Sequence, residues 1–160
     1  MNSLVIFASR TGNTRRVAEA IADGLRPHGS VTLLAVDDVP ATFAGTDLVV
    51  IGGPTEAHGM TPPLVDLLDR FAAALDGIAA AAFDTRLRWP LLLSGSAGAR
   101  IAARLRRAGA RVIAPAESFF VTRQPRLEEG ELERATAWGA TLAAAVGTGT
   151  RAEAVGSSVA

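Results

Sequence analysis

Short, continuous apolar runs alternate with amphipathic helical patterns along most of the chain, and this alternation limits the possible folds more than any other feature. A continuous apolar run is typical of a strand that is buried on both faces of a parallel sheet. Because strands and helices alternate, we predict a single α/β domain with a doubly wound parallel sheet and helices on both faces. The expected strands cover residues 4–8, 31–36, 48–51, 79–83 and 111–122, the last of them broken or bent at Pro115.

Amphipathic spacing and stop signals locate the helices. The first expected helix follows Thr14 and ends near Gly24 or before Pro27. The other three are expected over residues 64–75, over 97–108, and from about 128 to 146. Between the second and third strands we expect at most a very short helical element, around 41–44. The predicted domain covers residues 1–146, and residues 147–160, dominated by Gly, Ser, Thr and Ala, are expected to be disordered.

The hexapeptide Ser9-Arg10-Thr11-Gly12-Asn13-Thr14 lies where the first strand ends and the first helix begins. Glycine lets a backbone turn tightly and approach a ligand closely. The start of a helix adds unpaired N–H groups and the positive end of the dipole. A simple helix cap needs one Ser, Thr, Asn or Asp residue. This segment has four residues of these types, Ser9, Thr11, Asn13 and Thr14, around Gly12. We therefore predict an anion site, most often one for a phosphate.

Missing residue types exclude several kinds of chemistry. The chain has no Cys, so thiol nucleophiles, iron–sulfur ligation and cysteine zinc sites are excluded. It also has no Lys, which excludes a Walker lysine and a Schiff-base lysine. Its two histidines are too few for a histidine metal cage, so we expect no metal site. Redox chemistry in this chain would therefore need a bound cofactor.

The net charge and the hydropathy of the chain indicate which large partners and which cell compartment to expect. The net charge is zero, which gives no overall attraction to nucleic acid or to an anionic membrane. No apolar segment reaches transmembrane length, and we expect a cytoplasmic protein. Asp37 and Asp38, after the second strand, could bind a ribose in a dinucleotide fold, but the first loop has one glycine where that fold needs three. We discount a dinucleotide site for that reason.

Two further loops follow strands that should end beside the hexapeptide. Gly52-Gly53-Pro54-Thr55 closes the third strand, and an irregular loop of residues 56–63 comes next. Asp84-Thr85-Arg86 follows the fourth strand, with Trp89 shortly after it. Open α/β sheets bind ligands at the carboxyl ends of their strands, so we expect these loops to converge on one site.

The hexapeptide and the third-strand exit together resemble the flavodoxin-like flavoproteins. Residues 9–14 match their phosphate loop, Ser/Thr-x-Thr-Gly-x-Thr, and Asp47 to Thr55 looks like their third strand with its Gly-x-Pro-Thr exit. The resemblance covers about residues 3–146. It implies a five-stranded sheet of order 2-1-3-4-5 and non-covalent FMN. The implied FMN-binding residues are Ser9, Arg10, Thr11, Gly12, Asn13, Thr14, Pro54, Thr55, Glu56, Ala57, His58, Gly59, Met60, Asp84, Thr85 and Arg86.

The resemblance implies electron transfer through FMN, with a partner protein as donor or acceptor. Many flavodoxins hold the flavin ring between a Trp and a Tyr, whereas this chain has no Tyr and offers His58 and Met60 in the third-strand loop. Two alternatives remain open. One is an FMN-dependent reductase that passes electrons from NAD(P)H to a quinone. The other is a binding or regulatory module that keeps the fold without the flavin.

Overall fold

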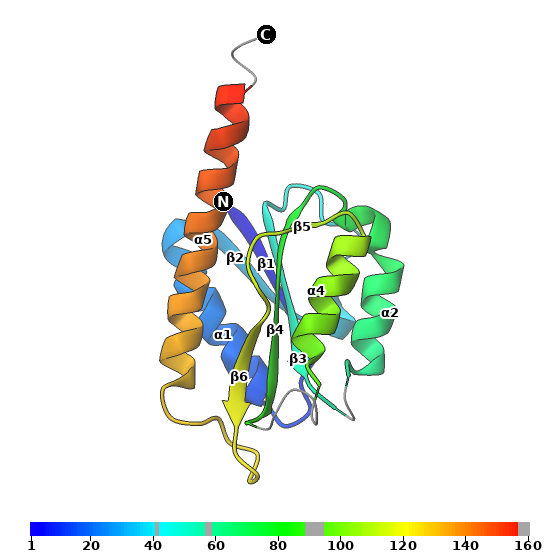
Figure 1. Cartoon of the computed structure of the whole chain (residues 1–160), viewed down its shortest axis with the longest axis vertical. Helices are drawn as coiled ribbons and strands as arrows, with labels where there is room; N and C mark the ends of the chain where they lie inside the picture. The colour runs from blue at the N-terminus through cyan, green and yellow to red at the C-terminus, as the bar shows by residue number, and fades with distance from the viewer. Residues whose placement is uncertain (41, 57–58, 89–94, 157–160) are drawn as a thin grey trace.

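A central parallel sheet lies between two layers of helices in the computed structural model of the chain (Figure 1). The structure describes residues 1–40, 42–56, 59–88 and 95–156, and side chains up to residue 148. Helices α1 and α5 cover one face of the sheet, and α2 and α4 cover the other (Figure 1). The predicted α/β architecture with helices on both faces is confirmed.

The strands are β1 (Asn2–Phe7), β2 (Ser30–Ala35), β3 (Leu48–Pro54), β4 (Ala79–Leu87), β5 (Arg111–Val112) and β6 (Glu117–Val121). Their order is β2-β1-β3-β4-β5, with all pairs parallel, as predicted. Strand β6 also pairs with β4, further along it than β5 does. The predicted fifth strand is thus divided into two short strands on either side of Pro115.

The helices are α1 (Asn13–Leu25), α2 (Pro62–Arg70), α4 (Ala97–Arg107) and α5 (Glu131–Gly156). Three short 3-10 helices are η1 (Arg26–His28), η2 (Val36–Asp38) and η3 (Ala72–Leu75). The short element predicted around 41–44 was misplaced, because the 3-10 turn forms earlier, at η2, where the Val36 side chain is buried. At 42–44 the Ala44 N–H donates to the Thr42 hydroxyl over 3.1 Å, a local bond that favours a turn over a helix. Residue 41 lies outside the described residues.

Helices α1 and α5 pack so closely that their backbones are in contact at two glycines. A Cβ atom added to Gly24 would overlap the carbonyl oxygen of Thr136, and one added to Gly139 would overlap that of Ile21. Two glycines therefore let the helices pack more closely than any side chain would allow. Trp138, on the same part of α5, packs against the rings of Phe83 and Phe119, with centroids 6.5 Å and 6.2 Å away.

Helix α5 continues beyond the predicted end of the domain. Its apolar contacts with the sheet end at Val146, but the helix runs on to Gly156 and projects past the body of the molecule (Figure 1). Residues 147–156 form the last turns of α5, and 157–160 lie outside the described residues. The domain boundary at residue 146 and the disorder beyond it stay predictions. Within the part of the chain that the structure describes, no helix has both the length and the apolar character needed to cross a membrane.

Candidate functional site

The carboxyl ends of β1, β3 and β4 meet at one edge of the sheet, because these strands are adjacent and parallel. Two backbone hydrogen bonds hold their exits together. The Ala8 N–H donates to Gly52 O over 3.0 Å, and the Thr55 N–H donates to Thr85 O over 3.0 Å. The three loops that the sequence predicts as a site therefore begin side by side.

The first loop turns sharply into α1 at Gly12, which has a positive φ of 87°. The Ser9 hydroxyl lies inside this turn and accepts from the N–H groups of Gly12 (3.1 Å) and Arg15 (3.4 Å). Nothing lies within 4 Å of a Cβ added to Gly12, so this side of the turn is open. The first turn of α1 contains no acidic residue that would repel an anion. The loop thus has the geometry and the charge that a phosphate site needs.

Two residues of this loop are buried and join it to distant parts of the chain. The Asn13 side-chain amide donates to the carbonyl oxygen of Pro125 over 2.8 Å, and to the Thr11 hydroxyl over 3.4 Å. The Thr14 hydroxyl lies 2.8 Å from that of Thr85, at the end of β4. These bonds hold the loop against both β4 and the β6–α5 connection.

The third-strand loop folds back on itself immediately after β3. The Glu56 N–H donates to Gly59 O over 3.0 Å, and the Gly59 N–H donates to Glu56 O over 2.7 Å. The Arg10 guanidinium lies 3.2 Å from the Glu56 carboxylate and so connects the first loop to this one. Met60 packs against the core on the α2 side. Ala57 and His58 lie outside the described residues.

Asp84 is fully buried at the end of β4 and connects three segments. Its Oδ2 accepts hydrogen bonds from the Thr55 hydroxyl (3.0 Å), the Ser96 hydroxyl (2.6 Å) and the Gly98 N–H (3.0 Å). Its Oδ1 is also buried and has no hydrogen-bond partner among the described residues. The resemblance to flavodoxin-like proteins implies that Asp84 and Thr85 contact FMN. In the structure one oxygen of Asp84 already holds the β3 exit against the start of α4.

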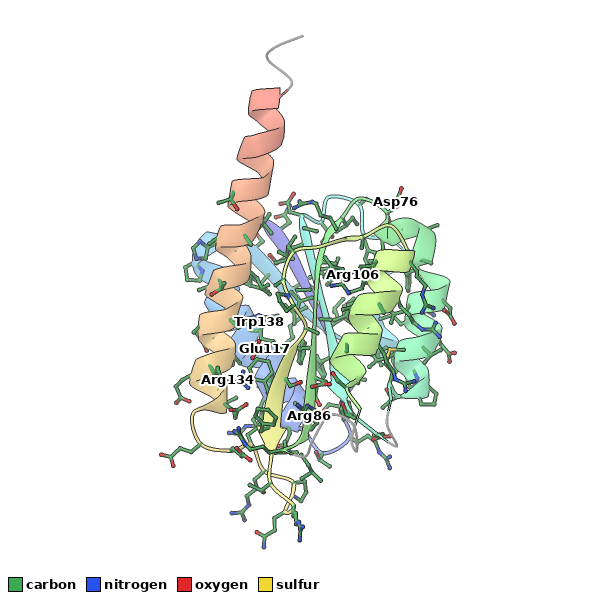
Figure 2. The ribbon with its side chains drawn as sticks, in the orientation of Figure 1. Asp76, Arg86, Arg106, Glu117, Arg134 and Trp138 are labelled. Carbon is green, nitrogen blue, oxygen red and sulfur yellow. The ribbon has the colours of Figure 1, made fainter. Side chains whose placement is uncertain are left out.

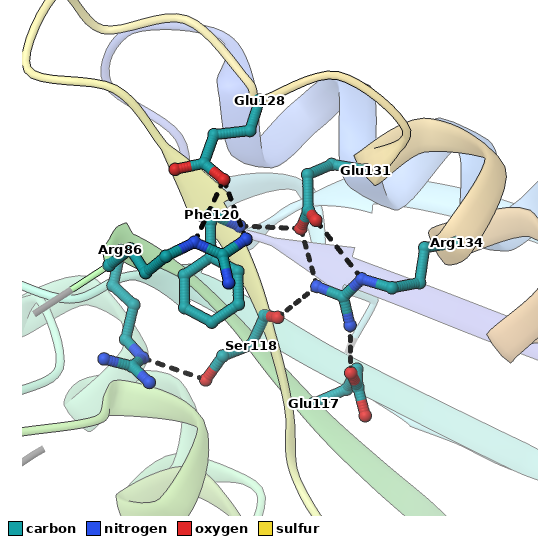
Figure 3. A network of polar contacts seen from close by, with 8 residues as sticks. Arg86, Glu117, Ser118, Phe120, Glu128, Glu131 and Arg134 are labelled. Atoms are coloured by element: carbon teal, nitrogen blue, oxygen red, sulfur yellow. Dashed lines mark hydrogen bonds and ion pairs between the residues drawn. The ribbon is translucent and has the colours of Figure 1, made fainter. Parts of the chain in front are cut away.

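Arg86 and Ser96 are the remaining described residues next to Asp84 at this edge of the sheet. Arg86 extends toward β6, where its Nε donates to the Ser118 hydroxyl over 3.1 Å (Figures 2 and 3). Ser96 caps α4 by accepting from the Ala99 N–H, which fits the turn and cap that its sequence indicates. The sequence does not reveal the bond between Ser96 and Asp84, because it depends on how α4 packs at the end of β4. It does not reveal the contact between Asn13 and Pro125 either, because these residues are 112 positions apart in the chain. Trp89 lies outside the described residues.

Comparisons with known proteins agree with this geometry. A family model described as Flavodoxin matches residues 5–141. The structure of a flavodoxin from the domain Archaea is 25% identical, with a TM-score of 0.79 over 91% of this chain and 99% of that one. Oxidised flavodoxin 1 from Bacillus cereus is 24% identical, with a TM-score of 0.75 over 89% of this chain and 97% of that one.

A longer protein also contains this fold. The flavodiiron protein from Giardia intestinalis is 24% identical, with a TM-score of 0.72, and the match covers 91% of this chain but 36% of that one. A search of the curated proteins found no match.

Proposed function

Because this chain belongs to the flavodoxin family, we propose that it transfers electrons through FMN that it binds non-covalently. FMN is the cofactor that the family indicates, and when bound it supplies one- and two-electron redox chemistry. The proposal depends most on one observation, the hydroxyl-rich turn at the start of α1 with its open side at Gly12. The buried Oδ1 of Asp84, which has no partner among the described residues, is a second feature that a polar ligand would suit.

The first loop would hold the phosphate group of FMN. The backbone N–H groups of the turn and the hydroxyls of Ser9, Thr11 and Thr14 are neutral donors, which suit a dianion at a helix start. The Arg10 guanidinium could add a charge-assisted contact, although it shares this role with its ion pair to Glu56. Because most of these donors are neutral, the loop could hold a phosphate without burying several cations.

The loops after β3 and β4 would hold the flavin ring. Pro54 to Met60 and Asp84 to Arg86 are the proposed ring contacts, and the Asp84 hydrogen bonds keep the beginnings of both segments in place. The bond between the Thr14 and Thr85 hydroxyls links the phosphate loop to the ring segment. Because this bond joins the phosphate loop to the segment proposed to contact the ring, a shift of the phosphate loop would also shift that segment.

The experiment is a visible absorption spectrum of the purified protein before and after addition of FMN, combined with a fluorescence-quenching titration. We expect a yellow protein that binds one FMN and is reduced by dithionite. A colourless protein that leaves added FMN fluorescent would instead favour a module that keeps the fold without the flavin.

A reductase is the second candidate. Flavodoxins that work as electron shuttles are typically strongly acidic, whereas this chain has a net charge of zero. Steady-state oxidation of NADH and NADPH, with a soluble quinone as acceptor, separates the two functions. A carrier gives no turnover without a separate reductase, whereas an FMN-dependent reductase oxidises the nicotinamide by itself.

A further inference from the structure

Helix α4 begins beside the exits of β3 and β4, and its first four N–H groups, those of residues 97–100, all donate to acceptors within the chain. The Thr55 hydroxyl accepts from the first over 2.9 Å, and Asp84 Oδ2 accepts from the second over 3.0 Å. Ser96 accepts from the third through its hydroxyl (3.0 Å) and from the fourth through its carbonyl oxygen (3.4 Å). Unpaired N–H groups at a helix start stabilise a nearby anion. At the start of α4 these donors are already used inside the chain.

The carboxylate of Asp84 places a buried negative charge at this helix start. Its Oδ2 accepts three hydrogen bonds, whereas its buried Oδ1 has no partner among the described residues, and Asp84 forms no ion pair with any of them. A Cβ atom added to Gly98 would lie 3.2 Å from the carbonyl carbon of Phe83 and 3.3 Å from the Asp84 nitrogen, so a glycine lets α4 approach β4 this closely. The charge is therefore stabilised by hydrogen bonds and by the helix start rather than by an ion pair.

This carboxylate lies between the two segments proposed to hold the flavin ring. Asp84 begins one of these segments, and its bond to the Thr55 hydroxyl, over 3.0 Å, reaches the other. The next residue, Thr85, is joined to Thr14 of the phosphate loop at 2.8 Å. A ring held by these segments would therefore lie close to a buried negative charge.

Two arginines near the ring segments have the opposite charge. Arg86 directs its guanidinium toward β6, where its Nε donates to the Ser118 hydroxyl over 3.1 Å (Figure 3). Arg100 is exposed on the first turn of α4, and a Cβ atom added to Gly59 would lie 3.5 Å from its Nη1. The ion pair between the first loop and the third-strand loop adds no net charge. Salt and water screen the exposed Arg100 more than they screen the buried Asp84.

We propose that Asp84 makes the site bind reduced FMN more weakly than oxidised FMN, and so lowers the redox potential of the bound flavin. Two electrons and one proton convert the oxidised ring into an anion. A buried carboxylate destabilises that anion, because the low dielectric of the protein interior strengthens the repulsion between like charges. Asp84 also occupies the helix start that would otherwise stabilise the anion. This inference rests on the proposed function, since it assumes that FMN occupies the site.

The test compares the dissociation constants of reduced and oxidised FMN, and the ratio of the two is the measured quantity. Fluorescence quenching gives the constant for oxidised FMN. Anaerobic equilibration of the FMN-loaded protein with a reference dye gives its potential, and the thermodynamic cycle then gives the constant for reduced FMN. We expect a ratio above one for the unmodified protein. Asp84→Asn removes the charge but keeps one acceptor oxygen, and should lower the ratio about tenfold, which raises a two-electron potential by about 30 mV.

Two control variants separate the charge of Asp84 from its structural role. Asp66→Asn makes the same change of charge at an exposed position on α2 and should alter the ratio less than twofold. Ser96→Ala removes one hydrogen bond of the carboxylate without removing its charge, so the ratio should stay constant or rise. An unchanged ratio in Asp84→Asn would overturn the proposal. An equal fall of the ratio in Ser96→Ala would also overturn it, because the effect would then come from the structure of the helix start.

Asp84→Ser is a second neutral variant, for the case that Asp84→Asn does not fold, and it should lower the ratio in the same direction. If neither neutral variant takes up FMN, the unmodified protein decides: a ratio above one supports the proposal, and a ratio below one overturns it. An unmodified protein that takes up no FMN fails earlier, at the absorption spectrum, and so overturns the proposed function instead.

Discussion

The hydroxyl oxygens of Thr14 and Thr85 lie 2.8 Å apart, so one hydrogen bond joins the start of α1 to the end of β4. Both residues are buried, and both belong to the proposed FMN site. A change at either threonine can therefore reach the phosphate and ring halves of the site together. Variants of this pair need controls that separate binding from stability.

Replacing Thr11 and Thr14 with Val tests the phosphate assignment. If both hydroxyls contact the phosphate, the double variant should lose about 2–4 kcal/mol of FMN binding free energy, measured by fluorescence quenching. Thr85→Val removes the same bond to Thr14 without removing a proposed phosphate contact, and should cost less. An unchanged affinity in the Thr11→Val, Thr14→Val protein would refute the phosphate assignment. The control is Thr136→Val with Thr141→Val, which makes the same chemical change at two exposed threonines of α5.

Asp84→Ala should destabilise the fold by about 2–4 kcal/mol, because two hydroxyls and one N–H lose their charged acceptor. Asp84→Asn keeps one carbonyl oxygen and should cost less, about 1–2 kcal/mol. Urea unfolding gives both values. The exposed Asp66→Asn is the control, and an Asp84→Ala protein as stable as that control would contradict the role given to the buried carboxylate.

Glu131→Gln should lower the free energy of unfolding by about 1–3 kcal/mol, because Arg134 then loses its most buried partner. The exposed Glu133→Gln lies on the same helix turn and should change stability by less than about 0.5 kcal/mol. Thermal unfolding of the two variants under the same conditions provides the comparison. A larger loss from Glu133→Gln would show that charge near the helix start matters more than the buried pair.

Gly24→Ala should destabilise the protein by about 1–3 kcal/mol or more, because the added methyl group meets the Thr136 carbonyl and forces α1 and α5 apart. Gly147→Ala is the opposite case, with nothing within 4 Å of the new methyl group. It should stabilise the helix by up to about 1 kcal/mol, because alanine favours helix more than glycine does. Chemical unfolding measures both, and the same sign for the two variants would contradict the packing described between the helices.

Local patterns predicted the fold well because most elements depend on residues close together in the sequence. The apolar runs located the strands, and the polar loop after residue 8 located the start of α1. The division of the last strand also followed from the sequence, since Pro115 cannot donate a ladder hydrogen bond. The position of η2 was not predictable in this way, because it depends on the burial of Val36 against other elements.

The contacts that organise the candidate site are mostly non-local, and the sequence did not reveal them. Asp84 was predicted to face a ligand, but its bonds to Thr55 and Ser96 follow from the strand order and from where α4 begins. Gly24 and Gly139 look like ordinary helix residues until α1 and α5 are known to be neighbours. Helix α5 exceeds its prediction because the apolar spacing ends at Val146 while the helical backbone continues.

Strand β4 has two separate partners on the same side, and their lengths are unequal. Its first part is paired with the two residues of β5, and its last part with the five residues of β6. A ladder that is interrupted between two short segments can open in parts, with each part having its own opening free energy. The amide protons of β6, which are tied to Glu131 and to the loop that carries Arg123, should therefore exchange with solvent independently of those in β5. Hydrogen exchange would then report on the arginine-bearing half of this edge without requiring the whole domain to unfold.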